Sequence, residues 1–386
     1  MKILFCGDIV INNPNNFALS NELQNIIDTH EIRCCNFEAP IVDNIPTPPI
    51  VKAGPSISQT SESAMSVVNA GFNLISIANN HIMDFGRIGL KKTLDFFNQK
   101  SIKTMGAGFT YSEIYTPHTI IDEKQRKIKI LPLAQAGFGL YINGTSICGH
   151  SWINHPDILS QIHNIRKDAD ILIIFSHAGL EDEIIPLPEW QSCYRNLIDC
   201  GVDIIIATHP HIVQGIETYK NKKIFYSLGN FYFDMASMKD NIEWNRSIAV
   251  SIDTNSLCCE YYPISFNNNV LDIDTNTRFL DDIQLRSSYL DNHLELERAT
   301  DILAEKLWEQ YYKSYYLNLT PRLSDISIYG MVKIIIKRIL YRKKPWINNT
   351  LNETMLLHNI QIETHRWLVE RYLYNKNIEA NKGILR

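Results

Sequence analysis

The sequence predicts an α/β fold. Short runs rich in β-branched residues alternate with helix-like stretches through the first two-thirds of the 386 residues, and this alternation is typical of such folds. Some runs, such as ILIIFSH at 171–177 and DIIIATH at 203–209, are largely apolar, as expected of strands buried on both faces. Two helix-like stretches finish at a glycine, the residue that most readily takes the left-handed conformation that closes a helix.

The individual elements can be placed in order along the chain. Candidate strands lie at 2–8, 32–38, 73–79, 128–136, 171–177, 203–209 and 223–229, and candidate helices at 61–71, 89–100 and 189–201. Five prolines within 40–55 exclude regular structure over that stretch, so a long loop is expected after the second strand. Residues 246–254 and 257–266 are typical of a meander that closes the sheet.

The last hundred residues differ in pattern from the rest. After about residue 285 helical runs dominate, which predicts a domain over 1–284 and a mostly helical C-terminal extension over 285–386. Within the extension, residues 326–346 have an apolar arc and a basic arc at helical spacing. This pattern fits a surface helix packed on the domain, or a helix that lies on an anionic membrane surface.

The composition is that of an ordinary folded protein. A net charge of -5, with 45% apolar and 20% charged residues, gives no support for a nucleic-acid partner. The N-terminal run MKILFCGDIV lacks the long apolar region of a secretory signal, and no stretch approaches the roughly 20 apolar residues that span a bilayer. A cytoplasmic location is therefore expected. The eight cysteines show no disulfide or Cys-x-x-Cys spacing.

Polar residues that can bind a metal follow one candidate strand after another. They are Asp8, Glu38, Asn80 with His81, His177, and His209 with His211. Because the carboxyl ends of strands line a common crevice in open α/β sheets, we expect these residues to converge on one site. Such a mixture of histidines, carboxylates and an amide suits Zn, Mn or Fe better than Ca.

The number of candidate ligands points to two ions. Six or seven ligands are too many for one tetrahedral ion, whereas a carboxylate that bridges two ions uses all of them. Two such ions activate a shared water and stabilise attacking and leaving oxygens. The reaction class implied is hydrolysis or group transfer at a phosphoryl or acyl centre.

Most of these residues also have a purely structural interpretation. Asp8 alone is typical of a turn or helix cap, His81 lies among turn-forming residues, and His177, which precedes Ala-Gly, is also consistent with a simple strand end. The pair His209 and His211 is harder to explain in this way. Proline between them blocks a helix, and residues two apart in extended chain face the same way, so shared ligation explains their crowding better than packing does.

Taken together, the sequence resembles a known family. The segments GD (7–8), NFEAP (36–40), ANNHIMDFG (78–86), GAG after Met105, SHAGLE (176–181), DCGVDIIIATHPHIVQGIE (199–217) and YSLGNFYFD (226–234) carry the resemblance. It is to the CapA family of capsule synthesis, the poly-γ-glutamate branch of the calcineurin-like metallophosphoesterases. The resemblance covers about residues 1–235.

The resemblance implies a four-layer α/β/β/α sandwich with two divalent ions, of Mn, Zn or Fe. By analogy, one ion would be held by Asp8, Glu38 and His211, and the other by Glu38, Asn80, His177 and His209. His81 would protonate the leaving group or steady the transition-state charge, and Asp84 would orient it. Glu181 and Asn230 match family positions near the pocket.

Two positions depart from the family pattern. The wider superfamily usually carries a histidine where this chain has Val10, so the first ion would have fewer protein ligands. Many family members also have tryptophan where this chain has Ala178, which alters a pocket wall.

Two functions follow from the sequence. The first is a metal-dependent hydrolase or transferase that acts on a phosphoester or polymer linkage in capsule biosynthesis. The alternative is a non-catalytic, metal-containing assembly factor that binds the polymer or a synthase. A further hypothesis is that residues 326–346 hold the protein at the inner membrane face.

Overall fold

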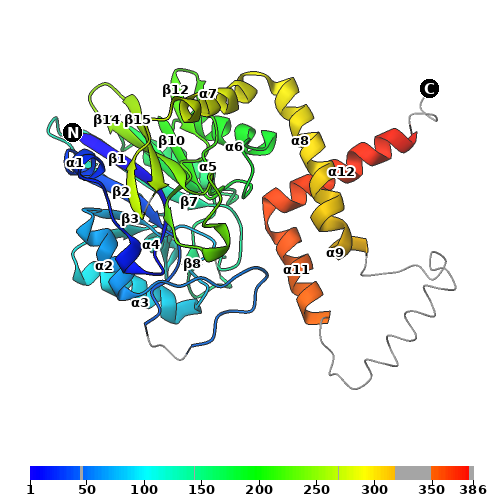
Figure 1. The fold of residues 1–386 in the computed structure, drawn as a ribbon, viewed down its shortest axis with the longest axis horizontal. Coiled ribbons are helices and arrows are strands. Elements are labelled where there is room, and N and C mark those ends of the chain that lie inside the picture. Colours follow the sequence, from blue (N-terminus) through cyan, green and yellow to red (C-terminus); the bar gives the residue numbers. More distant parts are fainter. Residues whose placement is uncertain (44–46, 143, 268, 318–348, 382–386) are drawn as a thin grey trace. The chain divides into compact units, whose positions relative to one another are not determined.

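The computed structural model (Figure 1) describes residues 1–386 except 44–46, 143, 268, 318–348 and 382–386. The chain forms two compact units. The first comprises Met1–Ile50 and Ser56–Glu297, and the second Val51–Pro55 and Arg298–Arg386. The first unit thus extends beyond residue 284, because helix α7 (Thr277–Asp291) packs on β11 (Ile216–Tyr219) and buries Phe279 and Ile283 in its core.

The first sheet has the strand order β16-β15-β14-β1-β2-β3-β4. Its parallel part consists of β1 (Lys2–Val10), β2 (Ile32–Phe37), β3 (Leu74–Ser76) and β4 (Lys103–Met105). Its antiparallel part consists of β14 (Arg246–Asp253), β15 (Cys258–Asn267) and β16 (Val270–Ile273). The meander expected from the sequence is therefore confirmed, with one further strand. The short strand β13 (Asn230–Phe233) pairs with the end of β1.

The second sheet has the order β11-β12-β10-β9-β7-β6. Besides β11, its strands are β6 (His118–Ile121), β7 (Lys127–Ala134), β9 (Ile171–His177), β10 (Ile204–Thr208) and β12 (Lys222–Phe225). The central strands β7, β9, β10 and β12 are parallel. Their carboxyl ends therefore lie along one edge of the sheet.

The two sheets pack face to face. Ile3 and Phe5 of β1 share a buried cluster with Ile173 and Phe175 of β9, and the rings of Phe5 and Phe175 are 5.2 Å apart. Alternate residues along β9, such as Ile174, are also buried and point to the opposite face. Both faces of each sheet are therefore apolar.

Helices cover the two outer faces, which gives a four-layer α/β/β/α sandwich as expected. The first sheet packs against α1 (Asn21–Asp28), α2 (Ser61–Asn69) and α3 (Gly86–Gln99), and the second against α5 (Ile158–Arg166) and α6 (Pro188–Asp199). Gly71 and Gly201 have φ of 94° and 109° just after α2 and α6, which confirms the two predicted glycine stops. Smaller elements are η1 (Pro14–Asn16), β5 (Ala107–Gly108), α4 (Tyr111–Tyr115), β8 (Gly149–His150) and η2 (Ala236–Met238).

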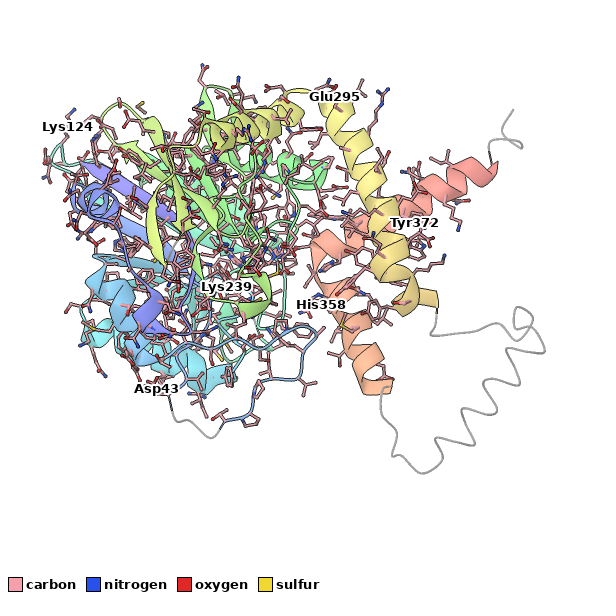
Figure 2. All side chains as sticks on the ribbon, viewed as in Figure 1. Asp43, Lys124, Lys239, Glu295, His358 and Tyr372 are labelled. Atoms are coloured by element: carbon pink, nitrogen blue, oxygen red, sulfur yellow. The ribbon has the colours of Figure 1, made fainter. Side chains whose placement is uncertain are left out.

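All regular elements described in the second unit are helical. They are α8 (His293–Leu307), which starts in the first unit, η3 (Trp308–Tyr312), α9 (Lys313–Leu317), α11 (Asn349–Gln361) and α12 (Glu363–Asn381). Figure 2 labels His358 on α11 and Tyr372 on α12. The Tyr372 ring stacks on Trp308 at 4.7 Å. The basic stretch 326–346 lies outside the described residues. Among the described helices, none has the length and apolar character needed to cross a membrane.

Candidate metal centre

The predicted site residues converge from both sheets at the ends of their strands. Asp8 lies near the end of β1, Glu38 directly follows β2, and Asn80 follows β3. From the second sheet, His177 is the last residue of β9, and His209 and His211 follow β10. Asp8, Glu38 and the three histidines are buried, while Asn80 is half-buried.

One group of potential ligands is formed by Glu38, Asn80, His177 and His209. Nε2 of His177 lies 3.0 Å from Nδ1 of His209, 3.0 Å from Oδ1 of Asn80 and 3.6 Å from Oε1 of Glu38. The ligand atoms of Glu38, His177 and His209 all lie within 4.8 Å of one another. Four atoms with lone pairs therefore surround a small buried volume.

A second group is formed by Asp8, Glu38 and His211, whose ligand atoms also lie within 4.8 Å of one another. Nδ1 of His211 lies 3.7 Å from Oδ2 of Asp8, and its Nε2 lies 4.0 Å from Oε1 of Glu38. Glu38 belongs to both groups. The mixed nitrogen and oxygen donors of the two groups fit Zn, Mn or Fe.

The backbone at His209 and His211 differs from the extended conformation assumed in the sequence argument. Strand β10 ends at Thr208, and His209 and His211 have φ of 100° and 63°. Residues other than glycine seldom adopt these values, and such strain is concentrated at functional sites. The turn also lets the backbone N–H of His209 donate to Oδ2 of Asp8 at 3.0 Å. The two rings lie close because of a strained turn, and not because of an extended strand.

The electrostatics of the site favour its cation-binding forms. Burial would raise the pKa of Asp8, but His177, His211 and a hydrogen bond from Asn36 hold the pKa of this carboxyl below its ordinary value. Burial lowers the pKa of His177, against the opposing effect of Asp8. A deprotonated carboxylate and a neutral imidazole are the forms that bind metals.

His81 and Asp84 lie in the turns between β3 and α3. Nδ1 of His81 lies 2.7 Å from Oδ2 of Asp84, and its Nε2 lies 4.0 Å from Oε1 of Glu38. The same Asp84 oxygen accepts a hydrogen bond from the backbone N–H of Ile57 at 2.7 Å. Asp84 therefore ties the His81 ring to the segment that follows the proline-rich loop, as an orienting residue would.

Glu181 and Asn230 also lie beside the ligand groups. Oδ1 of Asn230 is 3.0 Å from Nδ1 of His211. Glu181 is half-exposed, and its Oε1 lies 3.8 Å from Nε2 of His209. Glu181, His209 and His211 form a third set of atoms within 4.8 Å of one another.

Several residues that contact the site were missed by the sequence argument. Asn36 donates to Oδ1 of Asp8 at 2.7 Å, and Nε2 of Gln135 lies 2.7 Å from Nε2 of His209. Both lie at strand ends, as Asn80 does, so the rule that found Asn80 would have found them had it been applied to every amide there. Trp244 packs on His211 with its ring 4.6 Å away, and no sequence pattern marked it.

Val10 is buried near the Asp8 end of β1, with 1% of its surface exposed. It pairs with Phe233 of β13. An aliphatic side chain here supplies no ligand to the group formed by Asp8, Glu38 and His211. That group therefore has three protein side chains, against four in the other group.

Comparison with known proteins places these residues in a family. Residues 2–235 match the model of the bacterial capsule synthesis protein PGA_cap. The chain is 32% identical over 187 residues to the capsule biosynthesis protein CapA of Bacillus anthracis. This match covers 46% of this chain and 44% of the relative. It is 32% identical over 188 residues to the PGA biosynthesis protein CapA of Bacillus subtilis (strain 168), covering 46% and 47%.

A more distant relative is a probable polyglutamine synthesis accessory protein of Mycobacterium tuberculosis (strain ATCC 25618 / H37Rv). It is 25% identical over 172 residues, covering 42% of this chain and 45% of the relative. The matched part thus spans under half the length of each of these relatives.

Proposed function

The chain belongs to the bacterial capsule synthesis protein family PGA_cap, within the metallophosphoesterase-like superfamily, and from this premise we propose that it is a metal-dependent hydrolase or transferase of surface-polymer assembly. The reacting bond would be a phosphoester of a precursor or the linkage of the polymer itself. The observation that carries the proposal is that two groups of potential ligands share one buried carboxylate, Glu38. A shared carboxylate holds two divalent ions side by side in hydrolytic sites.

The ligand assignment follows from the two groups. Asp8, Glu38 and His211 would hold one ion, and Glu38, Asn80, His177 and His209 the other. When bound, two such ions lower the pKa of a shared water and stabilise the attacking and leaving oxygens.

His81 would carry the proton for the leaving group. Its Nδ1 is engaged by Asp84 at 2.7 Å, so the proton to be transferred would reside on Nε2, the nitrogen nearer Glu38. Asp84 would keep the ring in this orientation, because Asp84 is itself fixed by the backbone of Ile57. A positioned acid of this kind contributes about 10²- to 10⁴-fold to a rate.

The substrate and partners follow the family. The substrate would be a surface-polymer precursor or the polymer, and the partners would be other proteins of capsule synthesis. Residues 326–346 would add peripheral contact with the inner membrane face. Sedimentation with anionic and neutral liposomes tests that contact, and equal recovery in the supernatant at low and high salt would exclude it.

The alternative function is a non-catalytic assembly factor. It is favoured by Val10, which supplies no ligand where the superfamily usually has a histidine, and by the name of the Mycobacterium tuberculosis relative, which is called an accessory protein. In this alternative the ions would stabilise the fold, and the surface around Glu181 would bind the polymer or a synthase.

One experiment tests the proposal and separates it from the alternative. The full chain is assayed with Mn, Zn and Fe on phosphodiesters, sugar phosphates and γ-glutamyl amides, and cells carrying His81→Asn are assayed for capsule. A catalytic role predicts metal-dependent turnover of one substrate class and loss of capsule in the variant. Normal capsule from His81→Asn, at normal protein level and metal content, would favour the assembly factor. His293→Asn, at an exposed position on α8, serves as the matched control.

A further inference from the structure

Trp244 covers one face of the His211 ring. The centres of the two rings are 4.6 Å apart, and the ring planes are inclined by 34°. Phe233 meets both rings, that of His211 at 4.8 Å and that of Trp244 at 5.2 Å. Trp244 is buried and follows β13 of the first sheet, whereas His211 follows β10 of the second sheet. The His211 ring is therefore enclosed by aromatic side chains that come from the other sheet.

A hydrogen bond to Asp182 fixes the indole of Trp244. The indole N–H donates to Oδ1 of Asp182 at 2.6 Å, and a bond to a carboxylate is stronger than one between neutral groups. Asp182 lies in the loop after β9, and its own backbone N–H donates to the carbonyl of Pro210 at 3.0 Å. Pro210 immediately precedes His211. Asp182 thus links the Trp244 ring to the same turn that carries His211.

The backbone beside Trp244 is tied to this turn through helix α7. Glu243 accepts a hydrogen bond from the guanidinium of Arg286 at 2.7 Å. Arg286 is buried on α7 and also donates to the backbone carbonyl of Val213. The segment that carries Trp244 is therefore fixed at its backbone, and the bond to Asp182 determines where the indole lies.

The orientation of His211 matters because its ligand group is small. Asp8, Glu38 and His211 are three side chains, and Val10 adds none. Each ligand of such a site must be held in its binding geometry by the residues around it. The ring nitrogens of His211 lie 3.7 Å from Oδ2 of Asp8 and 4.0 Å from Oε1 of Glu38. Rotation of the ring would carry both nitrogens away from the two carboxylates.

We propose that Trp244 and Asp182 are positioning residues. Their hydrogen bond holds the indole against the His211 ring, and so keeps His211 in place for the ion that it shares with Asp8 and Glu38. The inference rests on the metal centre of the proposed function. Within the described part of the chain, Asp182 belongs to none of the ligand groups, so its carboxylate acts through Trp244 and not on the ion.

Titration of the metal-free, full-length chain with Mn²⁺ tests the consequence. Asp182→Ala and Trp244→Phe remove the same hydrogen bond from its two ends, and each should lower the affinity for one ion about 10- to 100-fold. The double variant should lose no more than either single variant, because both changes break one interaction. Asp182→Asn keeps an oxygen acceptor and should bind as the unaltered chain does. Asp240→Ala, which removes an exposed carboxylate from the segment that carries Trp244, is the matched control.

The loss should fall on the ion at His211 alone. In a His211→Ala background, Asp182→Ala should cause no further loss of affinity, whereas in a His177→Ala background it should weaken the remaining ion. A merely structural role would weaken both ions alike. Equal losses in the two backgrounds would overturn the proposal, as would unaltered affinity in both Asp182→Ala and Trp244→Phe. Asp182 is exposed, so Asp182→Ala leaves the core intact.

The position of the ring can also be measured without metal. NMR of the metal-free chain with ¹³C-labelled histidine, with the His211 signal identified by its loss in His211→Gln, detects the ring current of Trp244. Asp182→Ala should move this signal toward the value of a free histidine, whereas Asp240→Ala should leave it in place. An unmoved signal in Asp182→Ala refutes the role of the hydrogen bond. A signal that moves in a chain that binds no Mn²⁺, Zn²⁺ or Fe²⁺ leaves the positioning of the ring standing and counts against the proposed metal centre.

Discussion

Nε2 of His177 and Nδ1 of His209 lie 3.0 Å apart, although the two residues belong to the ends of neighbouring strands. This separation is too short for two nitrogens that each hold a separate ion, but it suits two ligands of one ion. His211 is oriented differently, with its Nδ1 near Asp8 and its Nε2 near Glu38. Loss of individual histidines should therefore affect metal content in a defined pattern.

We expect the unaltered chain to bind about two ions. His177→Ala and His209→Ala should each lose the same ion, so the double variant should retain the other one. His211→Ala should weaken that other ion, and Glu38→Gln should weaken both. Elemental analysis of the purified, dialysed proteins measures this pattern. If His209→Ala kept its full metal content, His209 would not be a ligand of the assigned site.

A separate prediction concerns His81, which faces Glu38 but belongs to neither ligand group. His81→Asn should lower kcat about 10²- to 10⁴-fold while metal content stays unchanged, because a positioned acid acts on the reaction and holds no ion. Asp84→Asn should give a smaller loss, since the ring remains present. Kinetics on the best substrate measure the loss of turnover, and elemental analysis shows whether metal is lost with it. If His81→Asn also lost metal, His81 would be a metal ligand and not only an acid.

Strand ends explain how much of this site was predictable. Asp8, Glu38, His177 and His209 could be grouped from sequence because parallel strands deliver their carboxyl ends to one edge. The same rule missed Asn36 and Gln135, because Asn80 was the one amide beside a strand end to which it was applied. Contacts that depend on a loop crossing from elsewhere, such as Trp244 on His211, leave no local pattern in the sequence.

The backbone conformation at His209 and His211 and the domain boundary could not be predicted from the sequence, for a different reason. The left-handed φ of His209 and His211 is imposed by tertiary contacts, among them the bond from the His209 N–H to Asp8, and local preference opposes it. The first unit extends past residue 284 because Phe279 and Ile283 enter the core between the sheets. A helical pattern reveals that these residues face one way, but not which layer they face.

Stability should depend on pH through His150, which is fully buried on β8. Burial lowers the pKa of His150 to about 4, against roughly 6.5 in an unfolded chain. The folded state therefore binds fewer protons between these values, and the free energy of unfolding falls as pH falls, by about 1.4 kcal/mol per unit of pH for this group. The effect is absent above about pH 6.5, where both states are neutral.

Urea unfolding of the unaltered chain and of His150→Gln at several pH values between 4 and 7 checks this dependence. The other histidines are common to both proteins, so the difference in slope isolates one proton. Parallel pH profiles for the two proteins would contradict the assignment. His293→Gln, at an exposed histidine, should keep the full slope.

The glycine that precedes Asp8 should tolerate no side chain. A Cβ on Gly7 would lie 1.8 Å from the carbonyl oxygen of Gly229 and 3.2 Å from the backbone nitrogen of Phe231. These are backbone atoms of the segment that pairs with β1, so they cannot rotate away as a side chain would. Gly7→Ala should therefore force β13 from β1, shift Asp8, and lower the free energy of unfolding by about 1–3 kcal/mol or more.

Gly137→Ala is the matched control for this prediction, because its Cβ would meet Asn80 at an ordinary 3.5 Å and so lies equally near the site. Urea unfolding and Mn²⁺ titration of both variants give the comparison. Gly7→Ala should lose stability and affinity together, whereas Gly137→Ala should keep both within about 0.5 kcal/mol. If Gly7→Ala folded and bound Mn²⁺ as Gly137→Ala does, the close approach of β1 and β13 would not be what positions Asp8.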